Sequence, residues 1–299
     1  MKLTVLVLTA AGLLADAHPV SAAKPSRTPK TPVPSSAKAP AFSITPGDIT
    51  DRRRNDNFFN RLEIEMKLEG EGLDGVKGTR TLTKKASDDT GRSLVNEEKK
   101  AVEFEKSMGS GAPQLKLELK NPARRATFLK EVSGQVELFM PGRDPNATAR
   151  VDGFLSRVDK LVAAPALKSA RADVTVVSRK TYDEEKKKDE ERRKKESESS
   201  GLAGQMAEAF AGLFSGMMGE IGENDVLLKV TDPEKKVFSI EVCDAAGKQI
   251  DGRGSMKVSG FWILSFPEKL PAEASLRIYM LTPKAIVTLP FALKNVVLP

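Results

Sequence analysis

Alternating apolar and polar residues run along most of the chain and predict β-strands. The first clear case is residues 62–68, where apolar side chains alternate with glutamate and lysine, as in a strand with one buried face. Further strands are expected at residues 102–104, 115–119, 132–140, 149–154, 173–177, 226–230, 237–242, 261–266, 275–281 and 285–291. Since little helical periodicity separates them, we expect a mainly β protein of antiparallel sandwiches rather than a doubly wound α/β fold.

Two short turn sequences resemble each other. Residues 88–94 and 244–250 share an aspartate, a glycine three positions later, a basic residue directly after it and then an aliphatic residue. Aspartate hydrogen-bonds its own backbone and glycine supplies a positive φ, so both segments predict β-hairpin turns. The match is explained either by two related modules or by chance recurrence.

Residues 183–224 interrupt the strand pattern and predict a helical hairpin insertion. The first half alternates acidic and basic blocks, which a helix brings together at i and i+4 in the pairs Glu184–Lys188, Asp189–Arg193 and Glu191–Lys195. Because these charges cancel locally, a solvated helix is expected there.

The second half of the insertion carries apolar residues at spacings of three and four. We call this set the apolar stripe, and it comprises Leu202, Met206, Phe210, Leu213, Phe214, Met217, Met218 and Ile221. The stripe either packs on its own sandwich or binds a partner protein, a second copy of the chain or a membrane surface. Gln205 and Glu208 argue against a membrane-spanning helix.

The N-terminus has the composition of a secretory signal peptide. Lys2 precedes an apolar run, and small residues end the segment near Ala23, so residues 1–23 predict export to the periplasm, cell surface or medium. Residues 24–57 are rich in proline and are expected to form a disordered linker.

Two sandwich domains are expected after the linker, at residues 58–143 and 144–299, the second holding the insertion. Proline, glycine and aspartate cluster at 141–146, which favours a border there. Alternatively, the border lies at the insertion, whose helices then form a linker.

Histidine usage limits the chemistry. His18 is the only histidine and lies within the predicted signal peptide, so the processed chain would lack the imidazole of Ser-His-Asp and Cys-His catalysis and of histidine-ligated zinc. We therefore expect no enzyme, no catalytic residues, no cofactor and no metal site. A carboxylate-pair hydrolase remains formally open. Asp88 and Asp89 could offer oxygens to calcium, but their spacing favours turn roles.

Charge and single residues add further limits. The formal net charge is +7, but basic residues are interspersed with acidic ones, and two tyrosines and one tryptophan offer few stacking surfaces, so nucleic acid is not an expected partner. Trp262 is interpreted as a core anchor rather than a ligand platform. Cys243 is the only cysteine, which excludes an internal disulfide.

The last third of the chain resembles a class of exported bacterial proteins. The strand pattern of residues 237–242, the turn at 244–247 and the closing residues 290–299 are similar to tandem Ig-like sandwich modules of such proteins, which are uncharacterised. The resemblance implies a fold and an envelope location and carries over no functional residue.

From these observations we expect a non-catalytic secreted or cell-envelope protein. It would act in protein–protein interaction or scaffolding through its sandwiches and insertion helix, with another envelope protein or a second copy as partner and without a transmembrane span. The alternatives are a carbohydrate- or peptide-binding module and, less favoured, a carboxylate-dependent hydrolase.

Overall fold

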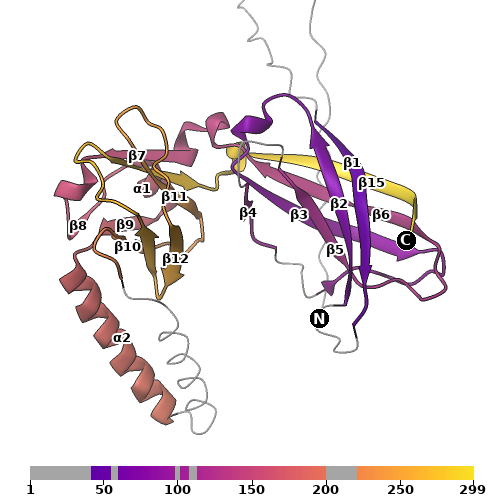
Figure 1. Ribbon diagram of the computed structural model, residues 1–299, viewed down its shortest axis with the longest axis horizontal. Coiled ribbons are helices and arrows are strands. Elements are labelled where there is room, and N and C mark those ends of the chain that lie inside the picture. Colours follow the sequence, from indigo (N-terminus) through magenta and orange to yellow (C-terminus); the bar gives the residue numbers. More distant parts are fainter. Residues whose placement is uncertain (1–41, 55–59, 98–101, 108–112, 200–220) are drawn as a thin grey trace, which may run out of the picture. The chain divides into compact units, whose positions relative to one another are not determined.

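The computed structural model describes residues 42–54, 60–97, 102–107, 113–199 and 221–299. These residues form fifteen strands, two α-helices and several short 3-10 turns, so the prediction of a mainly β fold is confirmed. All strand pairs in the described part are antiparallel, and they build four sheets that pack in two modules (Figure 1).

The first module consists of a three-stranded and a four-stranded sheet. In sheet order these are β1 (Ser43–Arg52), β2 (Arg61–Glu69) and β5 (Leu115–Leu119), and then β15 (Ile286–Val297), β6 (Phe128–Phe139), β3 (Gly78–Asp88) and β4 (Glu105–Lys106). Aliphatic side chains from both sheets share one core, in which Leu62, Ile64 and Val132 are completely buried.

The second module has a five-stranded and a three-stranded sheet. In sheet order these are β12 (Gly254–Val258), β13 (Phe261–Ser265), β10 (Val226–Thr231), β9 (Asp173–Val176) and β8 (Lys160–Leu161), and then β11 (Val237–Cys243), β14 (Ser275–Met280) and β7 (Thr148–Asp152). Helix α1 (Pro165–Ala170) adds Ala166 and Leu167 to the shared core.

The alternation that predicts strands is explained by burial of one face. In β2, Leu62, Ile64 and Met66 lie inside, whereas Glu65 and Lys67 are exposed. Because side chains of a strand alternate between its two faces, this arrangement removes the apolar residues from water without a helix.

Two strands differ from the linker and domain boundaries expected from the sequence. β1 falls within residues 24–57, which we expected to be a disordered linker, but it pairs with β2, and its Ile44 and Ile49 pack against the first core. β15 falls within the predicted second domain, residues 144–299, but it pairs with β6 in the first module. Alternation reveals a buried face and does not reveal which sheet covers it.

The insertion begins with the predicted helix. α2 (Arg179–Ser199) includes the expected ion pair between Asp189 and Arg193, with 3.0 Å between Oδ2 and Nη2. Of the apolar stripe, residues Leu202 to Met218 lie outside the described residues, while Ile221 packs against the apolar cluster on the outer face of β10 and β13. No helix in the described ranges combines the length and the apolar character needed to cross a membrane.

Candidate binding cleft

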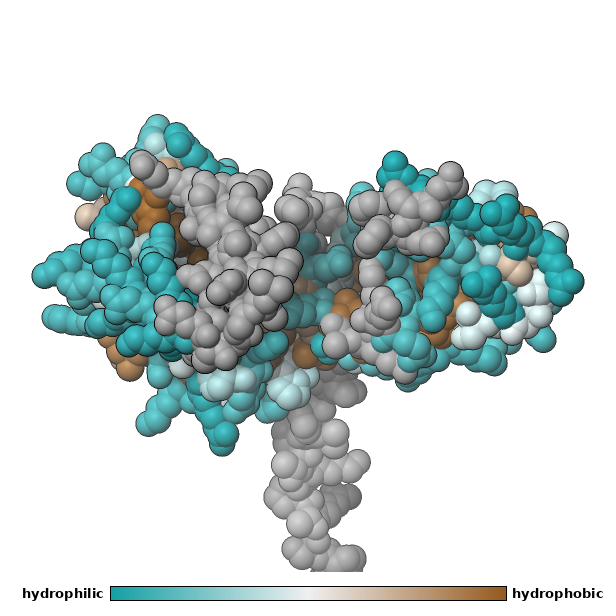
Figure 2. Space-filling view, turned by 90° about the horizontal axis from the view of Figure 1, so that it is seen from below, coloured by the Kyte–Doolittle hydropathy of each residue, from teal (hydrophilic) through white to brown (hydrophobic). Residues whose placement is uncertain are grey.

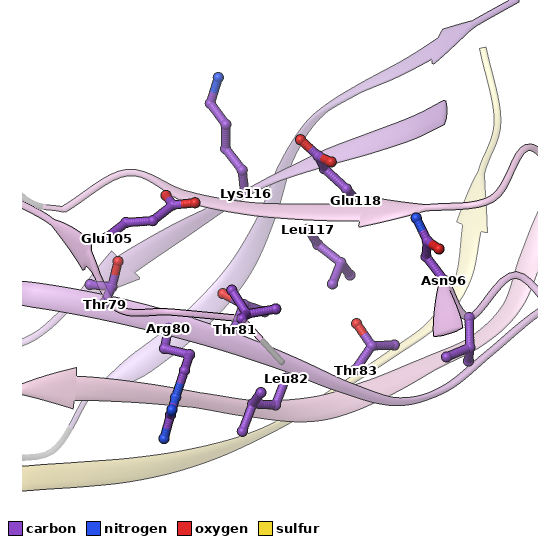
Figure 3. A pocket seen from close by; sticks show the side chains of 12 residues that line it. Thr79, Arg80, Thr81, Leu82, Thr83, Asn96, Glu105, Lys116, Leu117 and Glu118 are labelled. Atoms are coloured by element: carbon purple, nitrogen blue, oxygen red, sulfur yellow. The ribbon is translucent and has the colours of Figure 1, made fainter. Parts of the chain in front are cut away.

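The first module contains a cleft of about 210 Å³ between β3 and β5, which we call the β3–β5 cleft. Residues 79–83 of β3 line one side and residues 116–118 of β5 line the other, with Asn96 and Glu105 near its ends (Figure 3). The cleft therefore lies where an edge of one sheet faces a strand of the other.

Three threonines form the β3 side of the cleft. Thr79, Thr81 and Thr83 point into it, whereas Arg80 and Leu82 point away from it (Figure 3). The register explains this arrangement, because Thr79 and Thr81 pair with Leu138 and Val136 and therefore share their core-facing side of the sheet. Hydroxyl groups thus stand in a row where aliphatic side chains would normally pack.

The β5 side combines an apolar residue with charged ones. Leu117 points toward the threonines, whereas Lys116 and Glu118 lie on the opposite face of the strand (Figure 3). A ligand in the cleft would meet a methyl-rich wall, the threonine hydroxyls and charges at its rim.

Both strands that flank the cleft offer sheet edges. β5 ends the order β1-β2-β5. β4 pairs with Gly78 and Thr79 of β3, and within the described ranges no strand pairs with residues 80–83 on that side. Strand edges carry backbone donors and acceptors that another extended segment can pair with.

The charged side chains near the cleft engage one another. The Nε of Arg80 donates a hydrogen bond of 2.8 Å to Glu137, and its guanidinium lies 4.5 Å from the ring centre of Phe104. Lys116 lies 3.3 Å from a carboxylate oxygen of Glu63. Burial raises the pKa of Glu63, but its contacts with Lys116 and Arg61 outweigh burial, so the net pKa is lowered. These pairs hold the charges on the outer faces of the sheets.

Asp88 and Asp89, considered above for calcium, have turn roles. Asp88 is completely buried and accepts hydrogen bonds from the backbone N–H groups of Thr90, Arg92 and Ala123 at 2.8–3.0 Å. Asp89 accepts from the backbone and hydroxyl of Thr127. No group of three or more histidine, cysteine or acidic residues in the described part of the chain is arranged to hold a metal ion.

Trp262 and Cys243 lie inside the second module. Trp262 is 8% exposed and packs in the core, with the Nζ of Lys257 3.8 Å from its ring centre. Cys243 is also buried, and burial raises the pKa of its thiol. Neither side chain is placed to meet a ligand at the surface.

The described surface offers few large apolar groups. The well-exposed ones among these residues are Val158, Leu161 and Val297, and the face drawn in Figure 2 is mainly hydrophilic. The predicted partner-binding residues of the apolar stripe, apart from Ile221, lie outside the described residues.

The β3–β5 cleft is not predicted by the sequence pattern. The signal available was the order Thr79-Arg80-Thr81-Leu82-Thr83, in which threonines alternate with larger residues. That alternation is typical of many strands, and nothing in it shows that the threonines face inward.

Comparison with protein-family models, curated proteins and solved structures found no match to this chain.

Proposed function

We propose that this protein is a non-catalytic, exported binding protein that holds an extended segment of another protein in the β3–β5 cleft. The observation that carries the proposal is the β3 edge at residues 80–83, with which no strand of the described residues pairs on the side away from β6, beside the threonine row.

Strand addition is the binding mode that suits this site. An extended peptide beside β3 would extend the sheet through main-chain hydrogen bonds, as in other cases of peptide recognition at a sheet edge. Thr79, Thr81 and Thr83 can each donate and accept a hydrogen bond, so they suit the alternating polar groups of a peptide backbone.

A peptide fits the lining better than a carbohydrate does. Sugar-binding sites commonly use aromatic faces, and the described lining of the β3–β5 cleft contains no aromatic side chain. Trp262, the single tryptophan, lies in the core of the other module.

An Ig-like sandwich is the fold that we propose for both modules. In support, the sheet orders β1-β2-β5 and β15-β6-β3 match the A-B-E and G-F-C orders of such sandwiches. The signal-peptide pattern of residues 1–23 supports the proposed export.

Binding can be tested with arrays of short random peptides and, in parallel, of glycans. We expect peptides of high β-propensity to bind and Thr81→Arg, which fills the cleft, to abolish binding. Thr288→Arg is the matched control, because Thr288 lies exposed on β15 of the same sheet. Glycan binding without peptide binding, or equal peptide binding by the two variants in folded protein, would contradict the proposal.

A further inference from the structure

The two modules contain the same arrangement of six strands. In the first module, β1-β2-β5 forms one sheet and β15-β6-β3 belongs to the other. In the second, β9-β10-β13 and β7-β14-β11 stand in the same orders. Pairing strand by strand makes β1, β2, β3, β5 and β6 equivalent to β9, β10, β11, β13 and β14.

The two similar turns make this equivalence residue by residue. Gly91 and Gly247 have φ angles of 85° and 80°, and each donates its N–H to the carbonyl of the aspartate three residues earlier, at 3.1 and 3.0 Å. Leu94 donates to Ala86 and Ile250 to Val242, at 3.0 and 2.8 Å. The shared sequence pattern of residues 88–94 and 244–250 therefore occupies corresponding positions in the two modules.

The sixth strand breaks the correspondence in a systematic way. β7 follows β6 along the chain but pairs with β14, whereas β15 follows β14 along the chain but pairs with β6. Figure 1 shows the consequence, since the yellow β15 lies among the indigo and purple strands of the first module. The strand that follows β6 along the chain is therefore paired in the second module, and the strand that follows β14 is paired in the first module.

The registers of the exchanged strands agree as well. Val132 and Leu276 are equivalent, because they lie opposite Ala86 and Val242 respectively. On their other sides, Val132 pairs with Leu293 of β15 and Leu276 pairs with Val151 of β7. β15 thus occupies in the first module the position that β7 occupies in the second.

The edge of β6 is shaped for β15. Eleven residue pairs join the two strands. Phe291 and Leu293 enter the first core, and the ring of Phe291 lies against Gly134, where an added Cβ would be 3.0 Å away. An edge with this register and this glycine selects the strand by shape as well as by backbone pairing.

We infer that the β6 edge is a binding surface for strand 286–297 and that a second copy of this chain can supply that strand. Within one chain, residues 281–285 tether β15 close to its site, so the high effective concentration favours pairing within the monomer. When concentrated chains refold together, an identical β15 from a neighbour competes for the same edge and produces a strand-exchanged dimer.

Cysteine pairs in the full chain test the exchange, in a Cys243→Ala background. Ser133→Cys with Ala292→Cys joins residues that pair across β6 and β15, and Gln135→Cys with Pro290→Cys is a second such pair. Arg277→Cys with Ala292→Cys is the control, since Arg277 of β14 is the equivalent of Ser133. We expect disulfides within the monomer for the first two variants and none for the control, with circular dichroism verifying the fold. A disulfide in the control alone would overturn the exchange.

Mixing tests the second copy. A chain with Ser133→Cys is unfolded and refolded, at high concentration, with a chain carrying Ala292→Cys. We expect disulfide-linked heterodimers whose yield rises with concentration, and none when Arg277→Cys replaces Ser133→Cys. Absence of the expected heterodimer in folded protein, or equal yield in the control mixture, would overturn the inference.

Discussion

Asp88 shows how one carboxylate organises a turn and its surroundings. Its oxygens serve three backbone N–H groups, one of which belongs to Ala123 in a separate loop. We expect Asp88→Asn to lower the free energy of unfolding by about 3 kcal/mol, because an amide replaces one accepting oxygen and removes the charge. Asp244→Asn, at the equivalent position, should cost less, since Asp244 is partly exposed and accepts from the N–H of Lys248. Urea unfolding of both variants measures the difference.

The same residue gives a dependence on pH. Burial raises the pKa of Asp88, but the hydrogen bonds from Ala123, Thr90 and Arg92 together lower it by more than burial raises it. The folded pKa therefore lies below the ordinary value of 3.8. Its contribution to stability is therefore present above that value and is lost as the pH falls through the folded pKa. We expect the difference between the native chain and Asp88→Asn to shrink in acid. An equal difference at neutral and acid pH would contradict this explanation.

Gly134 marks a close approach of three strands. A Cβ at this position would lie 2.2 Å from the carbonyl oxygen of Leu82 and 3.0 Å from the ring of Phe291. We expect Gly134→Ala to destabilise the protein by about 3 kcal/mol, because the backbone of β3 must move. Gly142→Ala is the control, since nothing lies within 4 Å of its added Cβ. Thermal unfolding of both variants checks the prediction.

Among the elements, α2 is attached to its module at its first turns. Tyr182 is buried and its ring centre lies 5.0 Å from that of Phe261, while Lys229 pairs with Glu185 at 2.7 Å. We expect Tyr182→Ala to lower the free energy of unfolding by about 3 kcal/mol and to speed amide exchange in α2. Lys187→Ala, at an exposed position, should leave both unchanged.

Elements were predictable from the sequence where local chemistry determines them. The alternating charges indicate α2, and the aspartate and glycine spacings indicate both turns. The strand β1 was not predictable from the sequence. Its two residues that pack against the first core, Ile44 and Ile49, lie beside Pro46 and after a proline-rich stretch, so the local sequence indicates a linker instead. The β3–β5 cleft was not predictable either, since its threonines line a cleft only because Leu117, from a distant strand in another sheet, faces them.

At the scale of the whole molecule, a substitution in β15 or β7 should destabilise the module in which that strand is paired. Leu293 lies in the last strand and packs in the first core, whereas its equivalent Val151 lies before the second module's other strands and packs in the second core. We expect Leu293→Ala to cost about 3 kcal/mol and to speed amide exchange in β6 and β3.

Val151→Ala is the matched variant and should speed exchange in β14 and β11 instead. Hydrogen exchange with mass spectrometry resolves these segments. Faster exchange in β14 rather than β6 on Leu293→Ala would contradict the pairing of β15.

The position of β15 also determines when the first module can be completed during synthesis on the ribosome. The strands from β1 to β6 are translated before the second module, yet β15, which completes the first module, is translated only after the second module's strands. Until then β6 presents an uncovered edge, and contacts between such distant parts of a chain form slowly. A chain interrupted near residue 280 would therefore contain the second module's strands β7 to β14 but would lack the strand that pairs with the outer edge of β6.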